Sequence, residues 1–138
     1  MSYNPNVASK YYTAQYYYPR LEFDDKLIDL GHQCFASWNK KLKLEVYFRL
    51  TYSLPKGVYG QYSSLWRKYN SPKDRFGEIL IDVEKHNTEE ELYDTIRHEL
   101  AHAICDLRFG MNCGHGSLWI HVAKLLRVRH SQYCKRVN

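Results

Sequence analysis

The sequence predicts an α+β domain, because helical periodicity and strand periodicity occur in separate segments of one short chain. Apolar residues recur at steps of three and four over residues 24–41, 89–109 and 117–129, as they do in amphipathic helices. Residues 43–52 instead alternate apolar and polar side chains, which is typical of a half-buried strand. The 138 residues suffice for one compact domain with one core. We therefore expect an N-terminal helix, a small antiparallel or mixed sheet, a long helix and a C-terminal helix.

Residues 1–20 are expected to form a tail, and residues 21–138 the domain. The tail is rich in tyrosine, has no acidic residue and shows no clear period. Its tyrosines could stack on nucleic-acid bases, but packing against the domain is the interpretation we favour. The tail lacks the apolar core of a secretory signal, and no apolar run in the chain is long enough to span a membrane. We therefore expect an intracellular protein, in the cytoplasm or the nucleus, without membrane contact.

The first predicted helix, residues 24–41, can be capped by Asp24 or Asp25. One side of it carries a regular apolar stripe. His32 falls off this stripe, so we expect its side chain to be exposed. The stripe consists of Leu27, Leu30, Cys34 and Trp38, widened by Ile28 and Phe35.

Three segments are candidates for strands. Residues 43–52 are the clearest of them, and a proline and a glycine then mark a turn. Residues 58–69 suit a second strand or a loop, and the turn signals of residues 71–75 follow. Residues 76–83 have the β-branched content of a strand. Because their apolar run is short, we expect this strand at or near a sheet edge.

Residues 89–109 give the strongest helix prediction. Thr88 and Glu91 fit a capping box at its start, and Gly110 is a stop signal at its end. The last helix, residues 117–129, would begin at its first serine or at the glycine before it. The apolar faces are Leu92, Ile96, Leu100, Ala103, Ile104 and Leu107 in the long helix, and Leu118, Val122, Leu125, Leu126 and Val128 in the last one.

The second half of the long helix contains His98-Glu99-x-x-His102. Residues four apart lie on one face of a helix, so the two histidines can bind the same metal ion. Glu99 is rotated by about 100° from His98, which directs it to a water at that ion rather than to the ion itself. This arrangement is typical of zinc hydrolases, in which the glutamate is the base. The alternative is a pair of solvated histidines beside a glutamate.

A third ligand for one zinc ion per chain is expected to be His115. It follows soon after the helix stops and stands between two glycines, where a turn could bring its ring back toward the helix. A downstream carboxylate is excluded as third ligand, because no acidic residue follows Asp106. His121 and Trp119 are candidates for positions beside the ligands, and for His121 an exposed surface position is the alternative. The other possible third ligands are His121, His130, Cys113 and Cys134.

The positive charge of the chain lies at its C-terminal end. The net charge is +5, yet residues 107–138 contain six basic residues and no acidic one. A one-sided basic surface indicates a polyanion such as DNA, although a solubilising face would look the same. Trp66, Trp119 and Tyr133 could stack on unpaired bases, with core packing as the favoured alternative. The candidates for DNA contact are Lys124, Arg127, Arg129, Lys135 and Arg136.

The four cysteines do not form a metal or redox motif of the C-x-x-C type. We expect reduced thiols, as is usual inside cells. Cys34 and Cys105 stand among apolar residues and are predicted to be part of the core.

The segment His-Glu-Leu-Ala-His, a twelve-residue spacer and His-Gly-Ser-Leu-Trp together resemble the SprT-like metalloprotease family, which includes proteases that act on DNA–protein crosslinks. Residues 35–42 are also similar to the N-terminal helix of that family. The resemblance covers roughly residues 23–130, and its specific part is residues 95–119. It implies a zincin-like metalloprotease domain with His98 and His102 among the zinc ligands. It also implies protein substrates that are bound or crosslinked to DNA, which could be single-stranded.

The chain departs from the family pattern in two places. Of an Arg-Leu…Thr-Ala-Gly segment in the first hairpin, only Arg49-Leu50-Thr51 is present. Many members also carry a four-cysteine zinc ribbon, but here only Cys134 follows the histidines. The chain would therefore be a minimal form without the ribbon, and its basic end would have to contact DNA alone.

The expected reaction is peptide hydrolysis by a water that zinc activates and from which Glu99 takes the proton. The strand near residues 78–83 is expected to bind the substrate backbone by strand addition. One alternative is a zinc-stabilised nucleic-acid-binding module without peptidase activity. Another is a metal-dependent hydrolase that acts on a substrate other than protein.

Overall fold

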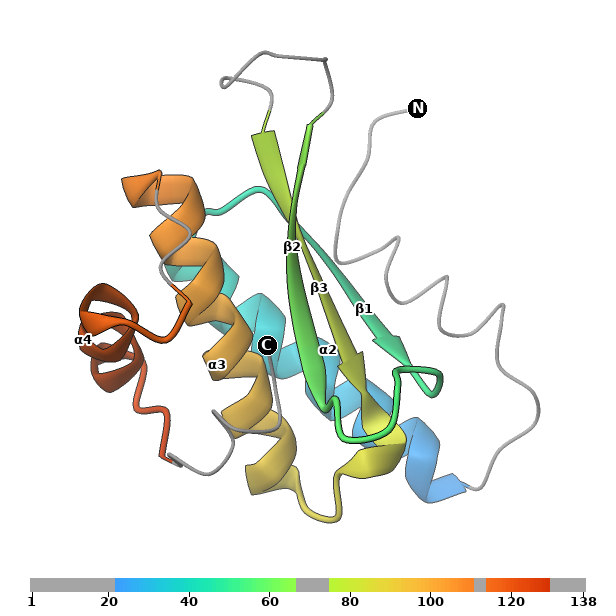
Figure 1. The fold of residues 1–138 in the computed structure, drawn as a ribbon. Helices are drawn as coiled ribbons and strands as arrows, with labels where there is room; N and C mark the ends of the chain where they lie inside the picture. The colour runs from blue at the N-terminus through green and yellow to red at the C-terminus, as the bar shows by residue number, and fades with distance from the viewer. Residues whose placement is uncertain (1–21, 67–74, 111–113, 130–138) are drawn as a thin grey trace.

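A computed structural model describes residues 22–66, 75–110 and 114–129 (Figure 1). The predicted N-terminal tail lies outside these residues, as do Cys113, His130, Tyr133, Cys134, Lys135 and Arg136. Within the described part the fold is α+β, as predicted, with three α-helices and a small mixed sheet. The elements are α2 (Glu22–Leu42), β1 (Val46–Thr51), β2 (Gly60–Trp66), β3 (Arg75–Asp82), the short 3-10 helix η2 (Val83–Lys85), α3 (Glu89–Phe109) and α4 (Ser117–Leu125).

The sheet has the strand order β1-β3-β2 within the described residues. Strand β1 runs parallel to β3, with Phe48 opposite Ile79, and β2 runs antiparallel to β3, with Tyr62 opposite Ile79. The segment near residues 76–83 therefore forms the central strand, and the prediction of an edge position was wrong. The length of an apolar run indicates how much of the two faces of a strand is covered. It does not indicate whether other strands pair with it on one edge or on both.

Helices α2 and α3 both pack against one face of this sheet (Figure 1). Phe35 of α2 stacks on Phe48 of β1, with ring centroids 4.4 Å apart. The side chain of Phe48 alternates with Tyr47 and Arg49, which point to the other face and are only half-buried. The core thus lies between the sheet and the two helices, as the alternation in the first strand predicts.

His32 is buried in this core, contrary to the prediction that it is exposed. Only 9% of its surface is accessible, and its ring meets that of Phe48 edge-on at 5.6 Å. The innermost line of α2 runs through Ile28 and Phe35, whereas Cys34 and Trp38 lie at its margin. The predicted apolar stripe of α2 was centred about one residue away from the buried line. His32, which was placed outside the stripe, therefore lies in the middle of the buried line.

Helix α3 has the predicted bounds because its ends are encoded locally. The Thr88 hydroxyl accepts from the Glu91 N–H, and the Glu91 carboxylate accepts from the Thr88 N–H, which completes the capping box. Gly110 ends the helix in the left-handed conformation at φ 66°. The apolar face of α3 is buried as predicted, with Leu107 half-buried at its end.

Helix α4 is shorter than predicted, since it ends at Leu125 instead of residue 129. Arg127 takes a positive φ of 62°, and the N–H of Val128 donates to Ala123. This turn buries Leu126, while Leu125 stays 67% exposed and does not belong to the apolar side. Because no glycine or proline marks this turn, the apolar pattern led to a predicted helix that extends to residue 129.

Four further observations bear on the predictions. Residues 60–66 form a strand rather than a loop. Trp66 at its end is 47% exposed, so core packing was the wrong alternative there, whereas Trp119 is buried. Cys34 and Cys105 are free thiols that pack in the core or against it, and burial raises the pKa of Cys34 to about 11. Among the described residues, no helix is long and apolar enough to cross a membrane.

His86 joins the end of the sheet to α3. Its Nδ1 lies 2.7 Å from the Asp82 carbonyl oxygen, and its Nε2 lies 2.7 Å from the Thr95 hydroxyl. Burial lowers the pKa of His86 to about 4, against smaller opposing effects of the Asp82 carbonyl and Glu91; Lys85 lowers it slightly further. Because burial disfavours the charged imidazolium, protonation of this ring works against the folded state.

We expect the protein to lose stability as the pH falls from about 6.5 to about 4, in part through His86. In this range the unfolded chain takes up a proton that the folded chain does not bind, so the free energy of unfolding decreases by roughly 3 kcal/mol at most for this residue. Urea unfolding at several pH values measures the slope. His86→Gln should reduce the slope, and the exposed His121→Gln should not; equal slopes in both variants and the wild type would contradict the assignment.

Candidate metal centre

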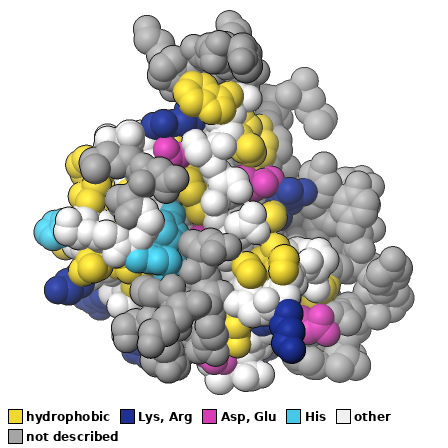
Figure 2. Space-filling model, viewed as in Figure 1, with side chains coloured by type: hydrophobic (Ala, Val, Ile, Leu, Met, Phe, Trp, Pro, Cys, Tyr) yellow, Lys and Arg dark blue, Asp and Glu magenta, His cyan; other side chains and the backbone are white. Residues whose placement is uncertain are grey.

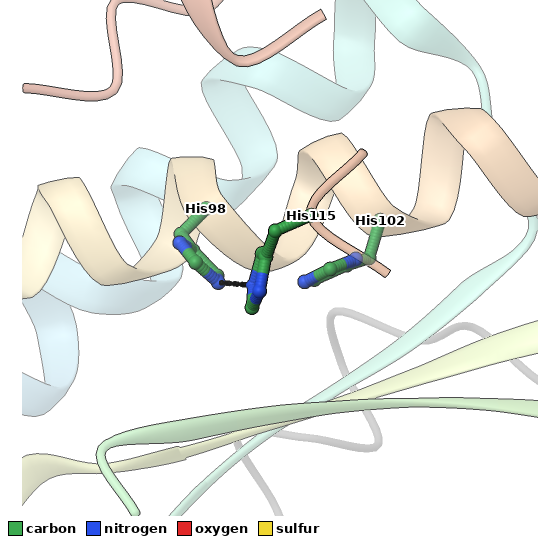
Figure 3. Close-up of side chains that lie close together, drawn as sticks. All are labelled: His98, His102 and His115. Carbon is green, nitrogen blue, oxygen red and sulfur yellow. Dashed lines mark hydrogen bonds between the residues drawn. The ribbon is translucent and has the colours of Figure 1, made fainter. Parts of the chain in front are cut away.

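Three histidines from two parts of the chain meet at one point. His98 and His102 project from the second half of α3, and His115 projects from the turn before α4 (Figure 3). One potential ligand atom from each lies within 4.8 Å of the others. The structure thus brings together the three residues that the sequence analysis selected as metal ligands.

The spacing of these rings fits a tetrahedral ion. The Nε2 atoms of His98 and His115 are 3.2 Å apart. Two nitrogens that bind one tetrahedral zinc at about 2.0–2.1 Å would be separated by roughly 3.3–3.4 Å. The ring centroids of the three histidines are 4.9–5.0 Å from one another, which leaves no room for a further side chain between them.

The electrostatic surroundings favour neutral rings, which are the form that binds metal. Burial, followed by the neighbouring histidines, lowers the pKa of His98 to about 2. Burial and His115 lower the pKa of His102 to about 4. Nδ1 of His98 and Nε2 of His102 are buried without a hydrogen-bond partner among the described residues. Buried polar atoms normally have partners. A metal ion held between the three rings would supply one for Nε2 of His102, whereas Nδ1 of His98 is not the nitrogen that faces His115.

Trp119 forms one wall of the site. Its ring centroid lies 4.7 Å from those of His98 and His115 and 5.4 Å from that of His102. Because Trp119 is buried on α4, it holds that helix against the histidines and keeps water from this side. Trp119 therefore lies beside the ligands, as the sequence analysis suggested, whereas His121 is exposed on α4.

The site can be reached from the surface of the protein. His98 is fully buried, while His102 and His115 are half-buried. Figure 2 shows histidine side chains at the surface on the face from which Figure 1 is viewed. The three rings are thus sunk into the protein but remain open to a molecule that approaches this face.

The side chain of Glu99 projects from α3 toward strand β2. It is fully buried, and neither carboxyl oxygen has a hydrogen-bond partner among the described residues. Burial raises the pKa of Glu99 well above the usual value. A buried carboxyl group without partners is costly and is more typical of a functional site than of a structural one.

Gly60 at the start of β2 makes room for this carboxyl group. A Cβ atom at residue 60 would lie 3.0 Å from Glu99 Oε2 and 2.8 Å from Thr95 Cγ2. The sequence analysis missed Gly60; its only signal was a glycine inside a possible strand, which often marks a close approach of another group.

A second missed group fixes the far end of α3 to the sheet. Tyr62 of β2 donates to Asp106 over 2.6 Å, and Arg75 of β3 forms an ion pair with Asp106 at 3.3 Å. Burial, and then Asp106, raise the pKa of Tyr62, so the hydroxyl stays protonated and remains a donor. Asp106 follows His102 by one helical turn, and these contacts therefore steady the metal-binding stretch of α3.

The family model described as the SprT-like family matches residues 32–137. The chain belongs to the SprT-like family. The matched range includes all three strands, α3 with its two histidines, the turn with His115 and α4. SprT-like membership and the histidine cluster agree with a metallopeptidase in general terms. No curated protein and no solved structure matched the chain.

The described basic residues near the C-terminal end differ in whether they contact acidic groups. Lys124 and Arg127 are exposed. The backbone N–H of Arg129 donates to Asp94 over 2.7 Å, and its guanidinium lies 3.6 Å from Glu90. Part of the predicted basic surface is thus locally balanced by acidic groups of α3.

Proposed function

We propose that this SprT-like protein is a zinc-dependent endopeptidase with a zincin-like domain, acting on proteins that are bound or crosslinked to DNA. One observation carries the proposal: three clustered histidines could hold a metal ion, and Glu99, which directly follows His98, has a buried carboxyl group without a hydrogen-bond partner among the described residues. Neutral nitrogen ligands suit zinc, and their number leaves a fourth position for a reactant. One ion per chain would be bound by His98, His102 and His115.

The chain's own residues would then have separate tasks in hydrolysis. Zinc, when bound, supplies a Lewis acid that polarises a carbonyl group and makes water more acidic. Glu99 accepts the proton of the attacking water and passes it to the leaving amine. Trp119 excludes water from one side of the site, and Gly60 leaves the space in which the Glu99 carboxyl group is held.

The strand proposed to bind the substrate differs from the one predicted from the sequence. The segment near residues 78–83 belongs to β3, whose two sides are already paired with β1 and β2. Strand β2 has one side that is unpaired within the described residues, and it passes along the side of α3 that carries Glu99. We therefore assign the binding of an extended substrate backbone to the outer side of β2.

The choice of DNA-associated substrates is supported by the excess of basic residues beyond Asp106. DNA binding concentrates an enzyme on the proteins that share the same DNA. The alternative function, a zinc-stabilised nucleic-acid-binding module, gives no use to Glu99. A purely structural zinc site needs no base beside the ion. An unpaired buried carboxyl group would then only destabilise the folded protein.

We expect removal of zinc by a chelator to abolish cleavage of a histone, and one equivalent of zinc to restore it. The assay is run with and without single-stranded DNA, which should stimulate cleavage. His115→Ala should lose both zinc and cleavage, while His121→Ala, which changes an exposed histidine of α4, should keep both. Cleavage that survives full removal of the metal would disprove the proposal. A zinc-loaded protein that binds DNA without cleaving would favour the binding module.

A further inference from the structure

A basic pocket lies at the end of α3 that is remote from the capping box. It is a cavity of about 560 Å³ between the end of α2, the loop to β1, the start of β3 and the last turn of α3. This is within the range of about 300–1,000 Å³ that is usual for ligand sites. Of the eight residues that line it, four are basic and one is acidic, which gives the lining an excess of positive charge. The charged lining residues are Lys41, Lys43, Arg75, Arg108 and Glu45.

Two of the cations are fixed in place by the fold. Arg75 donates to the carbonyl oxygen of Asp106 and pairs with its carboxylate. Arg108 donates to the carbonyl oxygen of Leu42 at the end of α2. Because these guanidinium groups are already oriented, little conformational entropy is lost in ordering them when a ligand binds.

The other two cations stand on a loop that is also held rigidly. Lys43 has a positive φ of 54°, and its neighbour Leu44 is bonded to the Asn39 side chain through both backbone groups. The side chains of Lys41 and Lys43 are exposed, and neither has a carboxylate partner among the described residues. The Lys41 ammonium lies over the ring of Trp38 at 5.7 Å from its centroid, a contact that does not neutralise its charge, so both ammonium groups can bind an incoming anion.

An exposed aromatic ring adjoins the pocket. The guanidinium of Arg75, which lines the cavity, also lies over the ring of Trp66 at 5.9 Å from its centroid. Trp66 is 47% exposed at the end of β2. A flat ring beside a row of cations is the combination that binds unpaired bases and their phosphates. A duplex would offer the phosphates but no free base face.

We propose that this pocket and Trp66 form a binding site for single-stranded nucleic acid, with phosphates at Lys41, Lys43 and Arg108 and a base stacked on Trp66. The site is separate from the predicted C-terminal basic residues. Arg108 follows His102 by six residues, or about 9 Å along the helix axis. A strand held there lies close to the metal centre. The choice of a nucleic acid as the ligand rests on the proposed function. The binding itself does not, because it is measured without proteolysis.

The test is fluorescence anisotropy of a labelled oligothymidylate with the zinc-loaded full chain, over a range of salt concentrations. Lys41→Gln/Lys43→Gln should weaken binding at least tenfold and reduce the slope of log affinity against log salt by about 1.4, or 0.7 for each lost phosphate contact. The matched control Lys26→Gln/Lys56→Gln removes the same charge at exposed positions outside the pocket lining and should change affinity less than twofold. Lys124→Gln/Arg127→Gln, at the predicted C-terminal basic residues, should weaken binding less than Lys41→Gln/Lys43→Gln does. Trp66→Ala should weaken binding more than Trp66→Phe, and Glu45→Gln should strengthen it.

Several outcomes would overturn the proposal. They are an absence of binding by the wild type, a loss of affinity confined to the Lys124/Arg127 variant, equal affinity for a duplex of the same length, and equal displacement by a polyglutamate peptide. Thermal melting of each variant shows that the fold is intact. The failure of this site would leave zinc-dependent cleavage unaffected, whereas the failure of the proposed peptidase activity would leave the anisotropy results standing.

Discussion

Glu99→Gln is expected to reduce peptide hydrolysis by roughly 10²–10⁴-fold, because the amide cannot accept a proton from the attacking water. Zinc content should stay at one ion per chain, since the three histidines and Trp119 are unchanged. Glutamine has nearly the same size as glutamate and carries no charge, so it fits the buried space beside Gly60 without a new cost of desolvation. The measurements are the rate of histone cleavage, metal analysis and thermal melting.

The matched control for this experiment is Glu89→Gln, which makes the same chemical change at an exposed position in the first turn of α3. Its cleavage rate should equal that of the wild type. Normal cleavage by Glu99→Gln with a full complement of zinc would show that Glu99 is not the base. Loss of zinc in that variant would instead assign the residue to the support of the metal site.

Gly60→Ala is expected both to destabilise the protein by about 1–3 kcal/mol and to lower the cleavage rate severalfold or more. The new methyl group would meet the branched side chain of Thr95 at 2.8 Å and the Glu99 carboxyl group at 3.0 Å. Both neighbours are fully buried, so neither can move away freely. Displacement of Glu99 would move the proposed base relative to the three histidines. Urea unfolding and the cleavage assay measure the two effects.

A second substitution can test whether the clash is the cause. Thr95→Ser removes the methyl group that lies nearest to residue 60 but keeps the hydroxyl that contacts His86. In a double-mutant cycle, Thr95→Ser should therefore recover part of the stability that Gly60→Ala loses. Ser64→Ala, at an exposed position of the same strand, is the control and should be neutral. Strictly additive effects would contradict the steric explanation.

The sequence was sufficient for those features that short stretches encode. The bounds of α3 follow from Thr88, Glu91 and Gly110, each of which acts within one helical turn. The grouping of His98 with His102 follows from helix geometry alone. His115 could be selected because the glycines beside it allow a turn soon after the helix ends, and the choice among ligands was narrowed by the absence of later carboxylates.

The sequence was insufficient where position depends on partners from distant segments. The central place of β3 is decided by pairing with β1, about thirty residues earlier, and no local pattern records it. The burial of His32 depends on the angle at which α2 meets Phe48. The role of Gly60 exists only because α3 lies against it, and the basic pocket joins residues 41–45 to Arg75 and Arg108.

The side of β2 that is unpaired within the described residues has a consequence for selectivity. Backbone N–H and C=O groups on such an edge bond to any extended chain, whatever its side chains. In a folded protein those groups are already bonded to one another, so a compact domain has nothing to offer the edge. An enzyme of the kind proposed here would therefore distinguish substrates by conformation instead of by amino-acid sequence. It would cut loose or unravelled segments and leave intact neighbours on the same DNA untouched.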